Sequence, residues 1–344
     1  EEGAFGLSTG LDYPPGSYAG TDELVELAQE AGRHGGIYHT HLRNKLGDQF
    51  LDPVKEALEI GQRGEIPCHL THFYQKLTHS GSAEQLLGLV DETVAQGQDV
   101  TMDCFHYAYS STRLLILIPE WAFNGGPEKL KQVLRSPEGR ERLRQEIRPR
   151  SGSFTDLMLT NFKQPHNRKF EGKSLAESAD MMEKSEVDTI CDLSLDEDLQ
   201  ISYVSPGPNL ATLPDFITHP RTMIGTDAVL LGEYPNPRSY GTFPTILAEY
   251  VREEGRLTLE EAIRKMTFMA AHRLDIRERG MLRDGMKADI VVFDPQTVKS
   301  PSTVRDPKQF PIGIEYVLVN GRIVVDQGQH TGVLAGRGLR HGRA

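Results

Sequence analysis

Apolar residues recur along the first hundred residues in two alternating patterns, one with the period of a helix and one with the period of a strand. The elements that these patterns predict are helices over 21–34, 54–62 and 82–96, and strands that end at His41, His72 and Phe105. Strands and helices that alternate at this spacing form a parallel sheet with helices on its outside. The first third of the chain is therefore expected to be α/β.

The alternation is lost between Tyr109 and about Ser205, where charged helical pieces alternate with polar loops. A segment of this length inside a barrel is usually a lid or a substrate loop, and decoration that only packs is the rival interpretation. The alternation returns with a strand over 221–226. Residues 235–244 follow it, and their prolines predict a stiff loop at the carboxyl end of that strand.

Short alternating strands follow Gly280, and Asn320-Gly321 is a strong hairpin signal between two of them. We therefore expect an α/β fold in which residues 1–280 are part of a TIM-type β/α barrel with a lid-like insertion at about 109–205. Residues 281–344 are expected to supply the C-terminal part of a small flanking β-sandwich.

Composition excludes several classes of partner. Lysine and arginine number 38 against 49 aspartates and glutamates, a formal charge of -11 that argues against nucleic acid or an anionic membrane as a partner. No apolar run is long enough to cross a bilayer. The three cysteines are too few and too scattered for a disulfide framework, so a reducing, cytoplasmic location is predicted. The number of copies in an assembly stays open, a homo-oligomer included.

Two imidazoles and a carboxylate are expected at one mouth of the sheet. His41 and His72 end neighbouring strands, and Asp227 follows a third apolar run. Neutral imidazole is a common zinc ligand, and a catalytic zinc keeps one position open for water. We therefore predict that His41 and His72 hold one or two divalent metal ions, taken to be Zn²⁺. The alternative is a pair of structural histidines that only make hydrogen bonds.

Neighbouring side chains offer other ligands. His39 lies two residues before His41 and shares its face, so a His-x-His chelate is an alternative ligand set. His69 is expected on the opposite face, packed in the interior. Cys68 is expected to be a small buried apolar residue rather than a thiolate ligand.

The carboxylate of Asp227 is placed to accept a proton from a water that zinc activates and to pass it to a leaving amine, which implies hydrolysis of an amide. The alternative is an aspartate that only starts a turn. Asp103, Tyr107 and Arg238 also fall at or beyond strand ends, where each can support the site or have a purely structural role. Arg238 is the best candidate for gripping a substrate carboxylate, because its planar guanidinium can donate two parallel hydrogen bonds.

Several segments, taken in order, resemble the N-acyl-D-amino-acid deacylases of the amidohydrolase superfamily. They are Glu2–Gly16, Tyr38–Arg43, Phe105–Tyr107, Ile118–Ala122, Gly225–Asp227, Pro235–Pro244 and Gly285–Asp294. The resemblance implies a metal-dependent hydrolase of non-peptide C–N bonds that releases an amino acid and a carboxylate. It matches His41 and His72 to the two later metal histidines of the family and Asp227 to its catalytic aspartate, and it implies substrate contacts for Tyr107 and Arg238.

The family's first half, with a His-x-His pair and a cysteine ligand, has no counterpart in this chain. The chain starts at Glu1, and we expect an upstream segment or a separate polypeptide to complete the barrel. Near the mouth the chain departs from the family at Asn44, Lys45, Tyr74, His106 and Asn236. Two alternatives therefore stay open. One is a cyclic-amide hydrolase like the hydantoinases and dihydropyrimidinases, and the other is a non-catalytic barrel subunit or fragment.

Overall fold

A computed structural model describes residues 2–44, 47–150 and 152–342. Its strands are β1 (Gly6–Gly10), β2 (Ile37–His41), β3 (Cys68–Leu70), β4 (Val100–Cys104), β5 (Tyr109–Arg113), β6 (Met158–Thr160), β7 (Ser202–Pro206), β8 (Thr222–Ile224), β9 (Ile290–Phe293), β10 (Ile314–Val319), β11 (Arg322–Asp326) and β12 (Gln329–His330). Its α-helices are α1 (Thr21–Arg33), α2 (Asp52–Arg63), α3 (Ala83–Ala95), α4 (Pro127–Arg135), α5 (Pro137–Glu146), α6 (Leu175–Met182), α7 (Glu186–Asp196), α8 (Leu213–Thr218), α9 (Arg238–Thr245), α10 (Leu259–Met266) and α11 (Phe268–Arg273).

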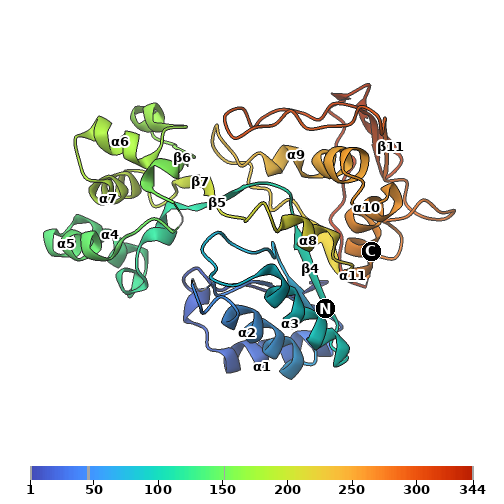
Figure 1. The fold of residues 1–344 in the computed structure, drawn as a ribbon, viewed down its shortest axis with the longest axis horizontal. Helices are drawn as coiled ribbons and strands as arrows, with labels where there is room; N and C mark the ends of the chain where they lie inside the picture. The colour runs from blue at the N-terminus through green and yellow to red at the C-terminus, as the bar shows by residue number, and fades with distance from the viewer. Residues whose placement is uncertain (1, 45–46, 151, 343–344) are drawn as a thin grey trace.

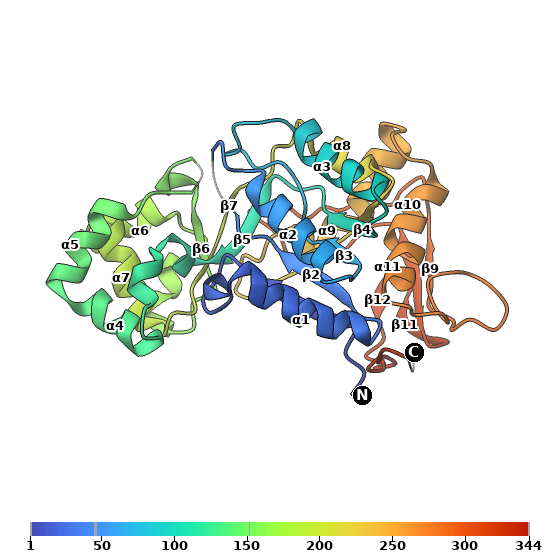
Figure 2. The ribbon, with the colours of Figure 1, turned by 90° about the horizontal axis from the view of Figure 1, so that it is seen from below.

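A five-stranded parallel sheet carries the core of the fold, in the order β1-β2-β3-β4-β8. Its outer face is apolar: Tyr38, Cys68 and Val100 occupy one register row and are fully buried in the main hydrophobic core. Figure 2 shows α1, α2 and α3 covering this sheet. The expected α/β class is thus confirmed, and the expected helices and strands of the first hundred residues are present, although β3 ends at Leu70 rather than at His72 and β1 was not expected. Cys68 is buried as expected.

The segment between β4 and β8 is a folded lobe rather than a run of helices and loops. It contains an antiparallel sheet in the order β5-β7-β6 that the sequence pattern did not predict. The strand β5 reads Tyr-Ser-Ser-Thr-Arg, without the apolar alternation that marks a strand. Helices α4 to α7 pack on this sheet around a second hydrophobic cluster, and the lobe stands apart at the left of Figure 1.

The expected stiff loop over 235–244 is wrong beyond Pro237, because α9 starts at Arg238 and continues into a π-helical turn over Ile246–Glu253. Pro237 has φ -58° and ψ -24°, values close to those of a helix, so the proline starts the helix instead of preventing it. Pro244 lies inside α9.

The C-terminal segment forms an antiparallel sheet in the order β12-β11-β10-β9. The predicted hairpin at Asn320-Gly321 is confirmed, with φ of 50° and 75° at the two residues, as a tight turn of this kind requires. In the part of the chain that the structure describes, no helix combines the length and the apolar character needed to cross a bilayer.

Gly225 is required where β8 leaves the sheet beside β4. Its N–H donates to the carbonyl of Cys104 at 3.0 Å, and a Cβ at this position would lie 2.8 Å from Oδ1 of Asp103. We expect Gly225→Ala to lower the free energy of unfolding by about 1–3 kcal/mol, because the added methyl group overpacks a rigid contact. Urea unfolding would measure this change.

The matched control is Gly88→Ala in α3, where an added Cβ would meet no atom within 4 Å. That variant should be as stable as the wild type or more stable by up to about 1 kcal/mol, because alanine favours a helix over glycine. If Gly225→Ala were as stable as the wild type, the close contact between Gly225 and Asp103 would be contradicted.

Candidate metal centre

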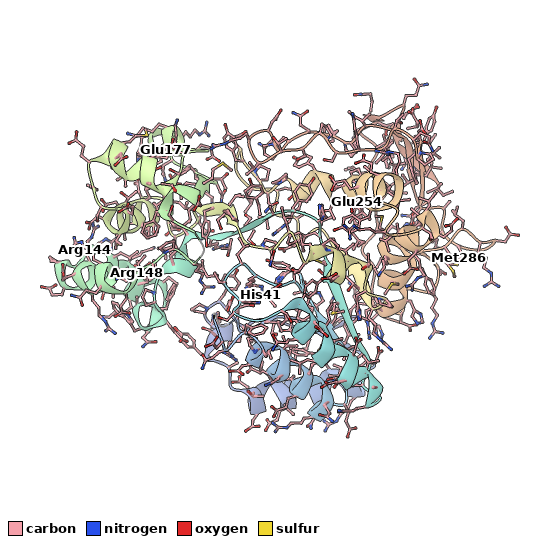
Figure 3. All side chains as sticks on the ribbon, in the orientation of Figure 1. His41, Arg144, Arg148, Glu177, Glu254 and Met286 are labelled. Carbon is pink, nitrogen blue, oxygen red and sulfur yellow. The ribbon has the colours of Figure 1, made fainter. Side chains whose placement is uncertain are left out.

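His41 and His72 meet at the carboxyl end of the parallel sheet. His41 is the last residue of β2, and His72 lies two residues beyond β3 with φ of 39°. Nδ1 of His41 lies 2.7 Å from Nε2 of His72, and the two rings are roughly perpendicular. Figure 3 shows His41 near the middle of the molecule. The structure thus brings together the two residues that the sequence selects as metal ligands.

The left-handed backbone of His72 is held by a carboxylate on the next strand. Oδ1 of Asp103 accepts the backbone N–H of His72 at 2.8 Å. The other oxygen of Asp103 bonds Nε2 of His69 at 2.9 Å. Burial acts to raise the pKa of Asp103, but the His69 hydrogen bond and the nearby charges outweigh it and lower this pKa to about 2. Asp103 therefore fixes His72 in place as an anion.

Burial, followed by the proximity of His41, lowers the pKa of His72 to about 3. The imidazole of His72 is therefore neutral at physiological pH. Neutral imidazole is the form that binds a metal ion.

His39 and His69 form a second row on the same inner face of the sheet. They are direct partners in the register of β2 and β3, and their rings stack with centroids 4.9 Å apart. The expectation that His69 lies on the opposite face is therefore wrong. Its spacing of three residues from His72 carries no information about the face, because His72 lies beyond the end of β3.

Among the described residues, His39, His69 and Asp103 have potential ligand atoms that all lie within 4.8 Å of one another. Both ring nitrogens of His69 are already hydrogen bonded, Nδ1 to Thr101 at 2.8 Å and Nε2 to Asp103. A metal ion in this row would have to break the bond between His69 and Asp103. The row therefore fits a hydrogen-bonded support for His72 better than a metal site.

Asp227 lies just beyond β8 and is paired with Arg238. Its carboxylate accepts from Nη2 of Arg238, and its carbonyl accepts from Nε at 3.1 Å. Burial raises the pKa of Asp227, the charge of Arg238 opposes this rise, and Asp103 and His41 are near enough to contribute with opposite signs. Asp227 is thus a carboxylate of raised proton affinity at the same mouth as His41.

Arg238 is among the most buried side chains, with 1% of the residue exposed. Its guanidinium lies over the ring of Phe105, 4.4 Å from the centroid. In this conformation Arg238 holds Asp227, and its role in gripping a substrate stays a prediction. Tyr107 points elsewhere: its hydroxyl contacts Thr245 at 3.2 Å and Ser300 at 3.5 Å. The structure therefore does not bring Tyr107 to the two histidines.

Sequence reasoning missed Asp12, whose Oδ2 lies 3.2 Å from Nε2 of His41. Asp12 also accepts both the backbone N–H and the side-chain amide of Asn44. Asp12 lies two residues beyond the end of β1, much as His41 is the last residue of β2. The sequence feature that could have identified it is a polar residue just after an extended segment. That segment, Gly6–Gly10, is rich in glycine and small polar residues and does not read as a strand.

The donors at this mouth fit a zinc ion. Two imidazoles present nitrogen atoms to one point between neighbouring strands, and the outer nitrogen of His41 faces a carboxylate, an arrangement common for metal-binding histidines. A catalytic zinc takes three protein ligands and a water. The described residues supply two imidazoles at this point.

Known proteins place the chain in a family. A profile of the Amidohydrolase family matches residues 151–325. The chain is 34% identical over 342 residues to the N-acyl-D-aspartate deacylase of Alcaligenes xylosoxydans xylosoxydans, an alignment that covers 96% of this chain and 59% of that protein. The chain therefore spans about three fifths of the length of this relative.

Solved structures agree. A D-aminoacylase whose binuclear metal centre was studied has a TM-score of 0.77 and 30% identity, with 97% of this chain and 62% of that chain covered. The N-acyl-D-glutamate deacylase of Bordetella bronchiseptica was solved with zinc and a phosphonate inhibitor. It has a TM-score of 0.77 and 28% identity, with 97% of this chain and 63% of that chain covered.

The L-hydantoinase of Arthrobacter aurescens shares the fold, with a TM-score of 0.54 at 14% identity over 95% of this chain and 66% of that chain. This likeness supports the partial TIM-type barrel predicted from the sequence. The matches with the deacylases have higher sequence identity and higher TM-scores. The chain therefore belongs to the Amidohydrolase family, and nearly its whole length is similar to N-acyl-D-amino-acid deacylases.

Proposed function

We propose that the chain is the later part of a zinc-dependent amidohydrolase that cleaves N-acyl-D-amino acids into an amino acid and a carboxylate. The observation that carries this proposal is the pair His41 and His72, whose nitrogens face each other at 2.7 Å, with Asp227 nearby and its pKa raised. The related deacylases support the substrate class.

Zinc bound at His41 and His72 would polarise the amide carbonyl and lower the pKa of the attacking water to ~7. In our proposal Asp227 accepts the proton of that water and donates it to the leaving nitrogen. Its raised pKa suits this task, because it makes Asp227 a better base and lets it hold the proton until the C–N bond breaks.

Arg238 has a positioning role in this proposal, since it holds both the carboxylate and the carbonyl of Asp227. It could grip a substrate carboxylate only with the part of its guanidinium that Asp227 leaves free. The hydroxyl of Tyr107 would have to break its contacts with Thr245 and Ser300 to reach the substrate. We therefore propose that Tyr107 contacts the substrate only when substrate is bound.

We also propose that another segment, upstream or on a separate polypeptide, completes the barrel and the ligand set. In the described residues β1 and β8 are the edges of the parallel sheet, each paired on one side. Closure of a barrel leaves no such edge. Within this arrangement, we propose residues 1–280 as the later part of the barrel with its insertion at about 109–205, and 281–344 as part of the β-sandwich. A cytoplasmic location is supported by three free, buried cysteines.

Zinc affinity tests the ligand assignment. His41→Ala and His72→Ala should each weaken zinc binding by more than the ~10–100-fold that loss of a supporting partner costs, because each removes a ligand. Competition with a chromophoric chelator would measure this loss. His34→Ala, which changes an exposed histidine at the end of α1, is the matched control. Wild-type affinity in both His41→Ala and His72→Ala would refute the site.

Turnover tests the role of Asp227. Asp227→Asn should retain zinc but lower kcat by about 10²–10⁴-fold, the usual share of a general acid–base group. The acidic limb of the wild-type pH–rate profile should lie above the usual range of aspartate, because burial raises the pKa of this carboxyl. A panel of N-acetyl-D-amino acids, their L-isomers and hydantoin would separate a deacylase from a cyclic-amide hydrolase. Unchanged kcat in Asp227→Asn would remove the proposal.

Native mass spectrometry tests the completing segment. The purified material should carry zinc together with a further polypeptide segment, either fused to this chain or bound to it, because the sheet has two edges to close. The denatured mass distinguishes a fused segment from a bound one. A chain that travels alone and without metal would instead favour a non-catalytic subunit or fragment.

A further inference from the structure

Asp12 is held against His41 by the backbone of the parallel sheet. Its neighbour Leu11 donates its N–H to the carbonyl of His41 at 3.1 Å, which extends the pairing of β1 and β2 by one residue. The side chain of Asp12 is only 6% exposed. Its place beside the imidazole therefore follows from the register and does not depend on a flexible loop.

The surroundings of Asp12 are donors of hydrogen bonds and positive charges. The backbone N–H of Asn44 donates to Oδ1 at 2.8 Å, its side-chain amide donates to Oδ2 at 2.9 Å, and Nη1 of Arg150 lies 3.6 Å from Oδ2. Asp12 is therefore an anion that can only accept hydrogen bonds.

This anion decides which nitrogen of His41 carries the proton. A neutral imidazole has one N–H and one lone pair, and Nε2 faces a carboxylate oxygen at 3.2 Å. The amide of Asn44 also lies 3.4 Å from Nε2. Its two N–H groups have closer acceptors in Asp12 at 2.9 Å and the carbonyl of Leu42 at 3.0 Å, so this amide does not compete for the lone pair of Nε2.

We propose that Asp12 is the positioning residue of the metal centre: by accepting the Nε2 proton of His41, it fixes the tautomer whose Nδ1 lone pair points at His72. The opposite tautomer would direct an N–H toward the place that a metal ion needs. This inference rests on the proposed function, because it supposes that His41 is a ligand.

Asp12 is not itself a ligand in this arrangement. It approaches His41 on the Nε2 side, whereas His72 approaches on the Nδ1 side. The competing interpretation is a purely structural aspartate that anchors Asn44 and Arg150, and this makes a different prediction.

The tautomer of His41 can be read directly from ¹⁵N chemical shifts of the metal-free, ¹⁵N-histidine-labelled protein. We expect the wild type to show the proton on Nε2. A proton on Nδ1 in the wild type would overturn the proposal, and this measurement requires no variant to fold.

The variant Asp12→Asn keeps the size of the side chain and removes its charge. It should produce a mixture of His41 tautomers and weaken zinc binding by about 10–100-fold, the range for loss of a carboxylate that orients a metal-binding histidine. Chelator competition measures the affinity. A purely structural aspartate would change the unfolding midpoint but leave the tautomer as in the wild type.

The matched control is Asp91→Asn, which removes a carboxylate 3.1 Å from Nε2 of His219, outside the metal centre. This variant should leave both zinc affinity and the His41 signals unchanged. Wild-type tautomer and affinity in Asp12→Asn would refute the role of Asp12. If the wild type bound no zinc although its Nε2 carried the proton, the proposed function would fail, while the tautomer assignment would stand.

Discussion

The carboxylate of Asp103 is the contact on which the centre depends. It receives the backbone N–H of His72 and the ring of His69 from β3, and it lies against the glycine that follows β8. The side chain of Asp103, in β4, thus contacts residues of or just beyond both neighbouring strands, β3 and β8. Without it, the left-handed backbone of His72 would lose its hydrogen bond in a partly buried place, where an unpaired polar group costs up to about 1–3 kcal/mol.

The carboxylates around the two histidines differ in their electrostatics, and this difference separates their roles. Asp12 and Asp103 are surrounded by donors, which lower the pKa of each, whereas burial raises the pKa of Asp227 despite its contact with Arg238. Carboxylates that stay ionised orient imidazoles well, because they accept a hydrogen bond from the ring N–H while the proton stays on the ring. The carboxylate of raised pKa is the one suited to move a proton.

Much of this could be predicted from the sequence, for a physical reason. In a parallel sheet, residues at strand ends meet at one edge, so His41, His72 and Asp227 could be selected without any knowledge of distances. The face of the sheet on which His69 lies could not be predicted. It depends on where β3 ends, and this strand ends at Leu70 rather than at His72. Asp12 was missed because the strand before it contains two glycines and little apolar alternation.

The lobe between β4 and β8 was also only partly predicted, because its strands pair with one another over long sequence distances that local patterns do not record. The structure ties this lobe to the mouth by polar contacts. The hydroxyl of Tyr13 meets Thr112 at 2.7 Å, and Arg150 approaches Asp12 at 3.6 Å. The lobe has its own hydrophobic core. Because Arg150 approaches the carboxylate that orients His41, the position of the lobe and the electrostatics of the centre are coupled.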